Sequence, residues 1–292
     1  MGMSMVKRPQ GLSGLITVFI IIGIAGVFLT YRAGGQNTQQ TIDNIALLQA
    51  NSSYMLKDGK FVIRDGKGAT CTVPLEAGTG DSASYFSDKA VYISDEVTAV
   101  AYGGTEADSS VKVLVSDDKG KTWSSTRVAE AGADHAGTKF LGFLSKRDGW
   151  LVTAGDVASG SQKNRVFLTA DGGKSWSEIG NISEAYPHVV TGAGFASPTA
   201  GFLSFRYDSN PDPVVYRTQD KGKTWVKCAV GLPPELKNVH SYPTALSPVF
   251  HGASGVLPVA MTDNDTGAQT QIRYVTDDSG KTWTFDKKSL PQ

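Results

Sequence analysis

The sequence predicts an all-β fold, a β-propeller of four-stranded antiparallel blades that follows one N-terminal transmembrane helix. Three observations lead to this prediction. One eight-residue turn pattern occurs four times, at intervals of about 50 residues. Each copy occupies the same place within a unit of four short strand-like segments. An uncharged apolar run of about 20 residues, enough to cross a bilayer, precedes all four units.

The apolar run extends from Gly11 to Thr30, and the basic residues Lys7 and Arg8 precede it. Basic residues stay on the cytoplasmic side, so we expect a single-pass protein of the cell membrane with its large domain on the extracytoplasmic side. A cleaved signal peptide is the alternative. The run is longer than a typical signal-peptide core, however, and no clear small-residue cleavage site follows it. We therefore expect a cytoplasmic N-terminus over residues 1–10, a signal anchor over 11–31, a polar linker over 32–44 and the propeller over 45–292.

The repeated pattern is S/T-x-D-x-G-x-S/T-W. Its copies are SDDKGKTW from Ser116, TADGGKSW from Thr169, TQDKGKTW from Thr218 and TDDSGKTW from Thr276. Each copy follows a β-rich run and leads into a segment that begins with Trp, which is typical of a hairpin.

Each residue type in the pattern has a structural role. The Asp carboxylate can accept hydrogen bonds from backbone N–H groups and close the turn. The Gly supplies the positive φ of a tight reversal, and the Trp ring should lie buried between neighbouring sheets. The residues concerned are Asp118, Gly120, Trp123, Asp171, Gly173, Trp176, Asp220, Gly222, Trp225, Asp278, Gly280 and Trp283. We therefore assign these twelve residues to structure rather than to chemistry.

Residues 45–83 contain three strand-like segments, and IRDGKGATC within them is similar to a degenerate copy of the pattern. Terminal repeats are commonly irregular, so we interpret this region as an atypical blade. The expected total is about five blades, with six possible if the blades are shorter than they seem from the spacing.

The four turns resemble those of the Asp-box, or bacterial neuraminidase repeat, superfamily, and the resemblance covers residues 84–292. It implies a propeller in which the boxes lie at the outer rim, between the third and fourth strands. It also implies that ligands meet loops around the central axis.

Sialidases are the best-known enzymes with such boxes, and the resemblance makes a diverged sialidase-like glycoside hydrolase the alternative function. Their pattern includes an Arg-Ile-Pro, two further Arg that bind the substrate carboxylate, a Tyr–Glu nucleophile pair and an Asp acid/base. Arg64 is the candidate for the first Arg, but no Pro follows it. Arg206, Arg217 and Arg273 lie near strand ends. The candidate nucleophiles Tyr207, Tyr242 and Tyr274 have no recognisable Glu partner. We therefore predict no catalytic, cofactor-binding or metal-binding residue.

Loops outside the boxes offer a different kind of site. YPHVV and NVHSYP combine aromatic residues, His and Pro, and each leads into the first strand of a blade. Their candidate ligand-contacting residues are Tyr186, His188, His240 and Tyr242. Arg206 and Tyr207 end a second strand instead, and we expect them to point outward.

Charge narrows the class of partner. Lys+Arg and Asp+Glu number 28 each, and no concentrated basic segment marks a nucleic-acid-binding face. Whether Cys71 and Cys228 form a disulfide is left open by the sequence. We expect a non-catalytic binding, scaffold or assembly module, with a protein or polysaccharide ligand at the propeller axis.

Overall fold

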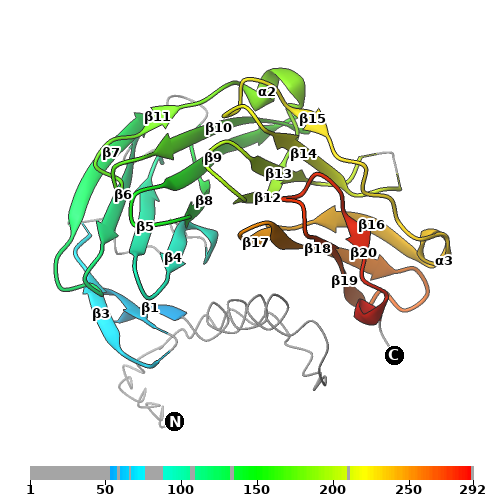
Figure 1. Cartoon of the computed structure of the whole chain (residues 1–292), viewed down its shortest axis with the longest axis horizontal. Coiled ribbons are helices and arrows are strands. Elements are labelled where there is room, and N and C mark those ends of the chain that lie inside the picture. Colours follow the sequence, from blue (N-terminus) through cyan, green and yellow to red (C-terminus); the bar gives the residue numbers. More distant parts are fainter. Residues whose placement is uncertain are drawn as a thin grey trace, which may run out of the picture.

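Five antiparallel β-sheets follow one another around an arc, in the order of the sequence (Figure 1). A computed structural model of the chain describes residues 53–57, 60–65, 67–75, 88–105, 109–131, 135–208 and 211–290. The first strands of the second, third and fourth sheets lie toward the inside of the arc, and the last strands lie along its outside (Figure 1). This is the predicted arrangement of propeller blades.

Four sheets share one topology, in which each strand pairs with the next along the chain. The second sheet holds β4 (Val91–Ile93), β5 (Thr98–Gly103), β6 (Ser110–Ser116) and β7 (Ser124–Glu130). The third holds β8 (Thr138–Phe143), β9 (Gly149–Ala158), β10 (Ser161–Thr169) and β11 (Ser177–Glu178). The fourth holds β12 (Val190–Phe195), β13 (Gly201–Phe205), β14 (Val214–Thr218) and β15 (Val226–Lys227).

The fifth sheet has the same order with one addition. Its path consists of β16 (His240–Ala245), β18 (Ser254–Asp263), β19 (Gln269–Thr276) and β20 (Thr284–Phe285), and β17 (Val249–His251) also pairs with β18. Short helices connect or flank the sheets: η2 (Asp88–Ala90), α2 (Ile182–Ala185), α3 (Pro234–Lys237) and η4 (Lys287–Ser289). The prediction of four antiparallel strands in each box-bearing unit is confirmed.

The first sheet contains β1 (Ser53–Lys57), β2 (Lys60–Arg64) and β3 (Thr70–Val73). In the turn between β2 and β3, Asp65 Oδ1 accepts hydrogen bonds from Lys67 N at 3.0 Å and Ala69 N at 2.8 Å. This turn therefore corresponds to a box, as the degenerate IRDGKGATC pattern suggested. The three strands correspond to the second, third and fourth strands of the other sheets.

The hydrophobic core is divided into four clusters, each shared by two neighbouring sheets. Ile63 of the first sheet and Tyr102 of the second belong to one cluster. The other three clusters lie between the second and third, third and fourth, and fourth and fifth sheets. Trp123, Trp176, Trp225 and Trp283 are half-buried, and each packs against a different cluster, at the junction with the preceding sheet. The predicted packing of the Trp rings between sheets is thus confirmed.

The boxes close as the sequence predicts. Asp118 Oδ1 accepts hydrogen bonds from Lys121 N at 3.0 Å and Thr122 N at 2.9 Å, and Oδ2 accepts from Thr122 Oγ1 at 2.6 Å. These bonds, with Thr122 Oγ1 contributing most, lower the pKa of Asp118 to about 2. The carboxylates of Asp171, Asp220 and Asp278 make equivalent bonds, and their pKa values are likewise lowered to about 2.

The box glycines have φ values between +75° and +84°. The residue before each of them is also left-handed, and three of these residues are Lys119, Lys221 and Ser279, with φ of 61–62°. A non-glycine residue pays a steric cost in that conformation. The sequence pattern predicts the glycine but not this second left-handed position.

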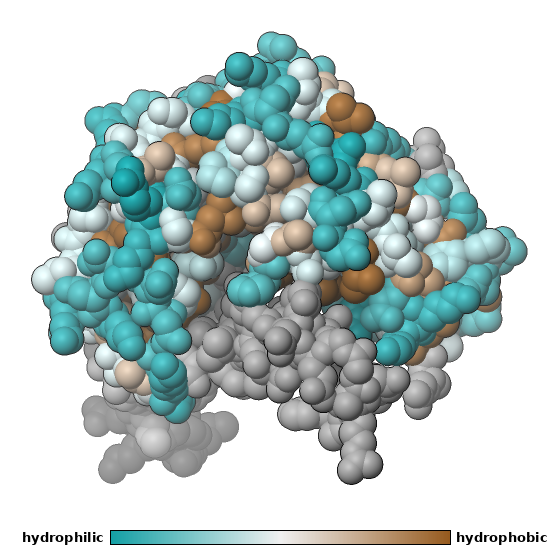
Figure 2. Space-filling view, in the orientation of Figure 1, coloured by the Kyte–Doolittle hydropathy of each residue, from teal (hydrophilic) through white to brown (hydrophobic). Residues whose placement is uncertain are grey.

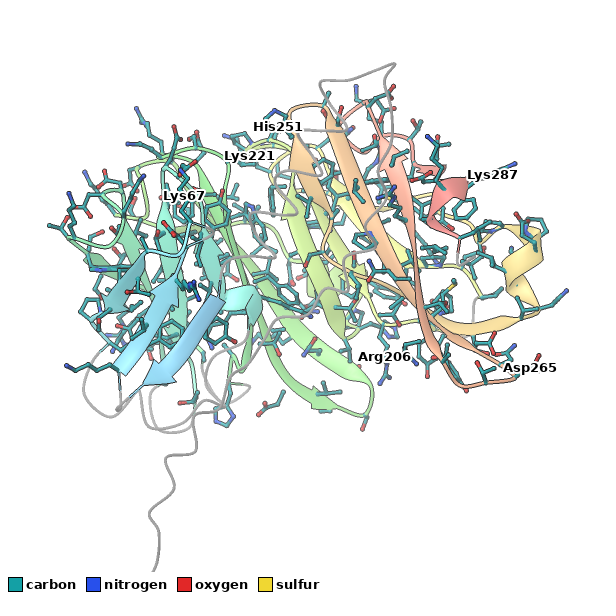
Figure 3. The ribbon with its side chains drawn as sticks, turned by 90° about the horizontal axis from the view of Figure 1, so that it is seen from below. Lys67, Arg206, Lys221, His251, Asp265 and Lys287 are labelled. Carbon is teal, nitrogen blue, oxygen red and sulfur yellow. The ribbon has the colours of Figure 1, made fainter. Side chains whose placement is uncertain are left out.

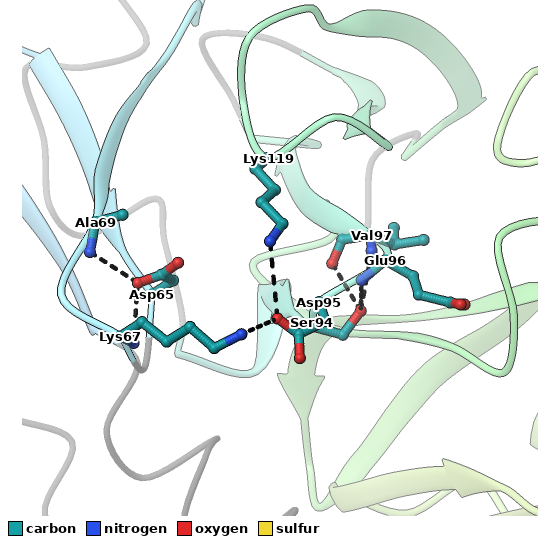
Figure 4. Close-up of polar contacts among 8 residues, drawn as sticks. All are labelled: Asp65, Lys67, Ala69, Ser94, Asp95, Glu96, Val97 and Lys119. Atoms are coloured by element: carbon teal, nitrogen blue, oxygen red, sulfur yellow. Dashed lines mark hydrogen bonds and ion pairs between the residues drawn. The ribbon is translucent and has the colours of Figure 1, made fainter.

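Polar contacts join the first two sheets at their exposed edge (Figure 4). Lys67 Nζ lies 2.9 Å from Asp95 Oδ1, and Lys119 Nζ lies 4.0 Å from the same oxygen. Both lysines and the aspartate are largely exposed, so these ion pairs stabilise the junction only weakly.

The predicted cytoplasmic segment, transmembrane helix and linker fall on residues 1–44, outside the described residues. In the part of the chain that the structure describes, no helix has the length and hydrophobicity needed to span a membrane. Cys71 and Cys228 are both free thiols.

Candidate functional site

The sheets present two different ends to solvent. At one, which we call the box end, each box packs against the turn between the first two strands of its own sheet. Gly172 N donates to Arg147 O at 2.9 Å, and Lys221 N donates to Thr199 O at 3.2 Å. Because antiparallel strands alternate in direction, the opposite end collects the loops between second and third strands and the connections between sheets. We call this the loop end. Figure 3 shows Lys221 and His251 at the box end, and Arg206 and Asp265 at the loop end.

The connection that carries Tyr186 and His188 lies at the loop end, before β12. Two contacts from β10 hold its backbone. Gln162 N donates to Pro187 O at 3.1 Å, and Asn164 Nδ2 donates to His188 O at 2.9 Å. The Gln162 and Asn164 side chains are buried. This connection is therefore positioned by the fold before any ligand arrives.

Tyr186 is the centre of an aromatic cluster. Its ring stacks on His188, with centroids 4.1 Å apart, and on Tyr216 at 4.8 Å. Its hydroxyl donates to Asp208 Oδ2 at 3.0 Å. Burial, and then the hydrogen bond to Asp208, raise the pKa of Tyr186 above its ordinary value. Burial and the hydrogen bond to the carboxylate therefore favour the neutral phenol over the phenolate.

Tyr207 and Tyr242 form a second pair, across the junction of the fourth and fifth sheets. Their centroids lie 4.8 Å apart at an interplanar angle of 46°. The side chains are 37% and 55% exposed. Tyr207 directly precedes Asp208, the partner of Tyr186, so the two aromatic pairs belong to one continuous region.

Tyr242 has a left-handed backbone, with φ of +57°. The pairing of β16 with β18 shifts register between Ser241 and Thr244, and Tyr242 lies in this irregularity beside the buried Pro243. A left-handed conformation costs a bulky residue about 1–2 kcal/mol. Strain of this kind tends to occur at functional sites, where the surrounding structure maintains it.

The other non-glycine residues with positive φ divide by position. Three lie in boxes and Ser159 lies in the tight turn between β9 and β10. The fifth, His135, precedes β8, and like Ser159 and Tyr242 it lies at the loop end. His135 Nδ1 lies 2.8 Å from Asp156 Oδ2, so local contacts fix this residue as well.

Exposed apolar side chains concentrate at the loop end. Across the described ranges, the large hydrophobic residues that are exposed are Leu144, Val157, Tyr207, Val226, Val239 and Tyr242. Val157, Tyr207, Val239 and Tyr242 belong to the loop end, on the third, fourth and fifth sheets. On the face shown in Figure 2, hydrophilic side chains predominate and hydrophobic ones form small separate groups. Concentrated exposed apolar surface is typical of an interaction site.

Three of the four residues expected to contact a ligand thus lie in this region. Tyr186 and His188 stack on each other, and Tyr242 contacts Tyr207. His240 begins β16 and pairs with Asp263, and its side chain is outside the described part of the structure. Tyr207 follows the second strand of its sheet; it is exposed, and its ring also contacts Tyr242 of the next sheet.

The arginines considered for a sialidase-like set lie in separate places. Arg64 ends β2 at the box end, and Arg217 is buried in part on β14. Arg273 Nε donates to Asp286 Oδ2 at 2.6 Å. Among the residues described, no three His, Cys, Asp or Glu side chains gather in a way that could hold a metal ion.

Comparison with known proteins adds a family and several distant relatives. A family model described as a BNR repeat-like domain matches residues 96–284. A probable oligoxyloglucan-reducing end-specific xyloglucanase of Neosartorya fischeri is 24% identical over 198 residues, which cover 59% of this chain. The match spans only 24% of that relative's length.

Two solved structures are also similar to this chain. A Hadza microbial sialidase is 15% identical, with 80% of this chain and 55% of the sialidase covered and a TM-score of 0.46. A Penicillium chrysogenum α-L-arabinanase is 13% identical, with 70% and 69% covered and a TM-score of 0.46.

Proposed function

Because the chain belongs to the BNR repeat-like domain family, we propose that it is a membrane-anchored, extracytoplasmic β-propeller that binds a partner at its loop end without catalysing a reaction. The observation that supports this most is the exposed, strained Tyr242 in contact with Tyr207. The box residues are engaged in turn closure and packing between sheets, so they are not available for chemistry.

Membrane attachment is the second part of the proposal. The uncharged run from Gly11 to Thr30, with Lys7 and Arg8 before it, supports a single N-terminal anchor. A tethered propeller would present its loops to partners close to the membrane. The anchor is tested by extracting membranes with carbonate, which should leave the chain in the pellet, and by external protease, which should digest the propeller in intact cells. Release by carbonate or protection from protease would contradict it.

The binding role is tested by photocrosslinking in intact membranes. A photoreactive amino acid is placed at Val157 or Asp265 at the loop end, and at Lys221 or His251 at the box end as matched controls. We expect adducts with a macromolecule from the loop-end positions and few from the controls. Adducts from the box end alone, or from neither end, would contradict the proposal.

A glycoside-acting enzyme is the second candidate function. The sequence match to a protein named as a xyloglucanase favours it. Against it, the arginines considered for binding a substrate carboxylate lie in separate places. The purified chain should be incubated with xyloglucan oligosaccharides and with a fluorogenic sialoside, with Arg64→Ala and Asp208→Asn as variants. Turnover that one of these variants abolishes would replace the binding role with a catalytic one.

A further inference from the structure

We propose that the partner is a protein, and that the loop end recognises a segment in which an apolar ring lies beside a carboxylate. Tyr207 and Tyr242 would contact the apolar ring, and Arg206 would bind the carboxylate. This inference rests on the proposed function, because it names the class of ligand for the same surface.

The kind of apolar surface favours a protein over a sugar. Val157 and Val239 are 53% and 43% exposed, and they lie on sheets on either side of Tyr207. Protein interfaces combine aromatic residues and Arg at an apolar core. Sugar rings stack on aromatic faces and gain little from exposed valines. The four exposed apolar residues are spread over three sheets, a width that a protein segment can span.

Arg206 directly precedes Tyr207 in the chain and adds a positive charge to the loop end. Its backbone N donates to Val189 O at 2.8 Å, which continues the pairing of β12 with β13 and fixes the position of its Cα. The side chain is exposed, and Figure 3 shows it at the loop end. Within the described ranges, no hydrogen bond or ion pair is recorded for its guanidinium group. A guanidinium prefers a carboxylate, which it can bind through two parallel hydrogen bonds.

The backbone that carries the Tyr242 ring is held in place before a partner binds. Tyr242 O accepts a hydrogen bond from Thr244 Oγ1 at 3.1 Å, and Pro243 beside it is buried. Tyrosine has few rotatable bonds, so an anchored ring loses little entropy when a partner covers it. Tyrosine and arginine are among the residue types that commonly dominate the binding energy of a protein interface.

The test uses a phage-displayed library of random 16-residue peptides and the full-length chain in detergent. Peptides that bind the chain are selected, and peptides that also bind detergent micelles without the chain are removed. We expect the enriched peptides to carry an aromatic residue or proline next to Asp or Glu. Tyr242→Gly and Arg206→Glu should each weaken binding at least about tenfold, as expected for central interface residues. Val226→Ala should bind normally, since Val226 is 57% exposed on β15, away from the loop end.

Charge reversal provides a second variant that does not depend on the strained position. Peptides in which Lys replaces the acidic residue should bind Arg206→Glu better than they bind the original chain. The inference is overturned if no peptide is enriched, if enriched peptides bind both variants normally, or if neutral oligosaccharides compete for the loop end. If loop-end crosslinks to a glycan persist while peptides fail, the inference is wrong and the proposed function stands. If the crosslinks are also lost, both are wrong.

Discussion

Gly280 allows the structural role of the boxes to be tested quantitatively. Its φ is +75°, and a Cβ placed on it would lie 2.3 Å from Cζ of Phe202. Phe202 is 1% exposed, and it packs against Phe250 and Trp283, with centroids at 5.0 and 5.9 Å. The ring therefore cannot move aside easily. Gly280→Ala should lower the free energy of unfolding by about 1–2 kcal/mol through the left-handed backbone and by a further ~1–3 kcal/mol through overpacking.

Gly160→Ala is the matched control. Gly160 has φ of +82°, and nothing lies within 4 Å of a Cβ built there. Gly160→Ala should therefore lower the free energy of unfolding by the backbone contribution alone, about 1–2 kcal/mol. Urea unfolding followed by tryptophan fluorescence gives both free energies of unfolding, provided that the slope against urea is unchanged. Equal destabilisation by the two substitutions would refute the claim that the box glycine is required by contact between sheets.

Three further predictions concern the boxes and the loop end. Trp176→Ala removes a half-buried ring that meets Phe143 edge to face. It should lower the free energy of unfolding by about 2–3 kcal/mol, which is less than the loss of a fully buried ring would cost. Loop-end crosslinking should stay unchanged, and a selective loss of crosslinks in the folded variant would contradict the structural role of this residue. The box carboxylates have folded pKa values of about 2, below the unfolded value of about 3.9, so their stabilisation is present above pH 4 and lost as the pH falls towards 2. The free energy of unfolding of Asp278→Asn should fall less steeply between pH 4 and pH 2 than that of the original chain. An unchanged pH dependence would count against the stabilising role of the hydrogen bonds to Asp278. Tyr242→Gly relieves about 1–2 kcal/mol of backbone strain. It also loses a similar amount of free energy through the missing ring contact and the greater entropy of the unfolded chain, so the free energy of unfolding should change by less than about 1 kcal/mol. Destabilisation well above this value would mean that the strain is absent.

The sequence predicted the boxes well because their geometry is local. Asp118, Gly120 and Trp123 act within eight consecutive residues, and the strands on either side follow from hairpin geometry. The packing of each Trp at the junction with the preceding sheet also follows once the units are recognised as repeats. The atypical first sheet was found from a degenerate pattern because Asp65 still closes its turn.

The loop end could be predicted only in part because its contacts are not local. Tyr186 and His188 are two residues apart, so a loop rich in aromatics was a sufficient signal. Tyr207 and Tyr242 are brought together by the register shift in β16 and by the packing of two sheets. Neither the periodicity of β13 nor the composition of β16 indicates that shift. Sequence alone therefore gave no sign of the contact between Tyr207 and Tyr242 or of the strain at Tyr242.

We propose that a partner covers the loop end, and not the box end, when the chain is in its membrane. The most direct test is the rate at which a maleimide labels a cysteine placed at Asp265 or at Lys221, with Cys71 and Cys228 replaced by serine. The rate in intact membranes is compared with the rate for the purified chain. We predict that Asp265→Cys is labelled much more slowly in membranes, while Lys221→Cys is labelled equally in both. Equal rates at Asp265→Cys, or slowing confined to Lys221→Cys, would contradict the claim.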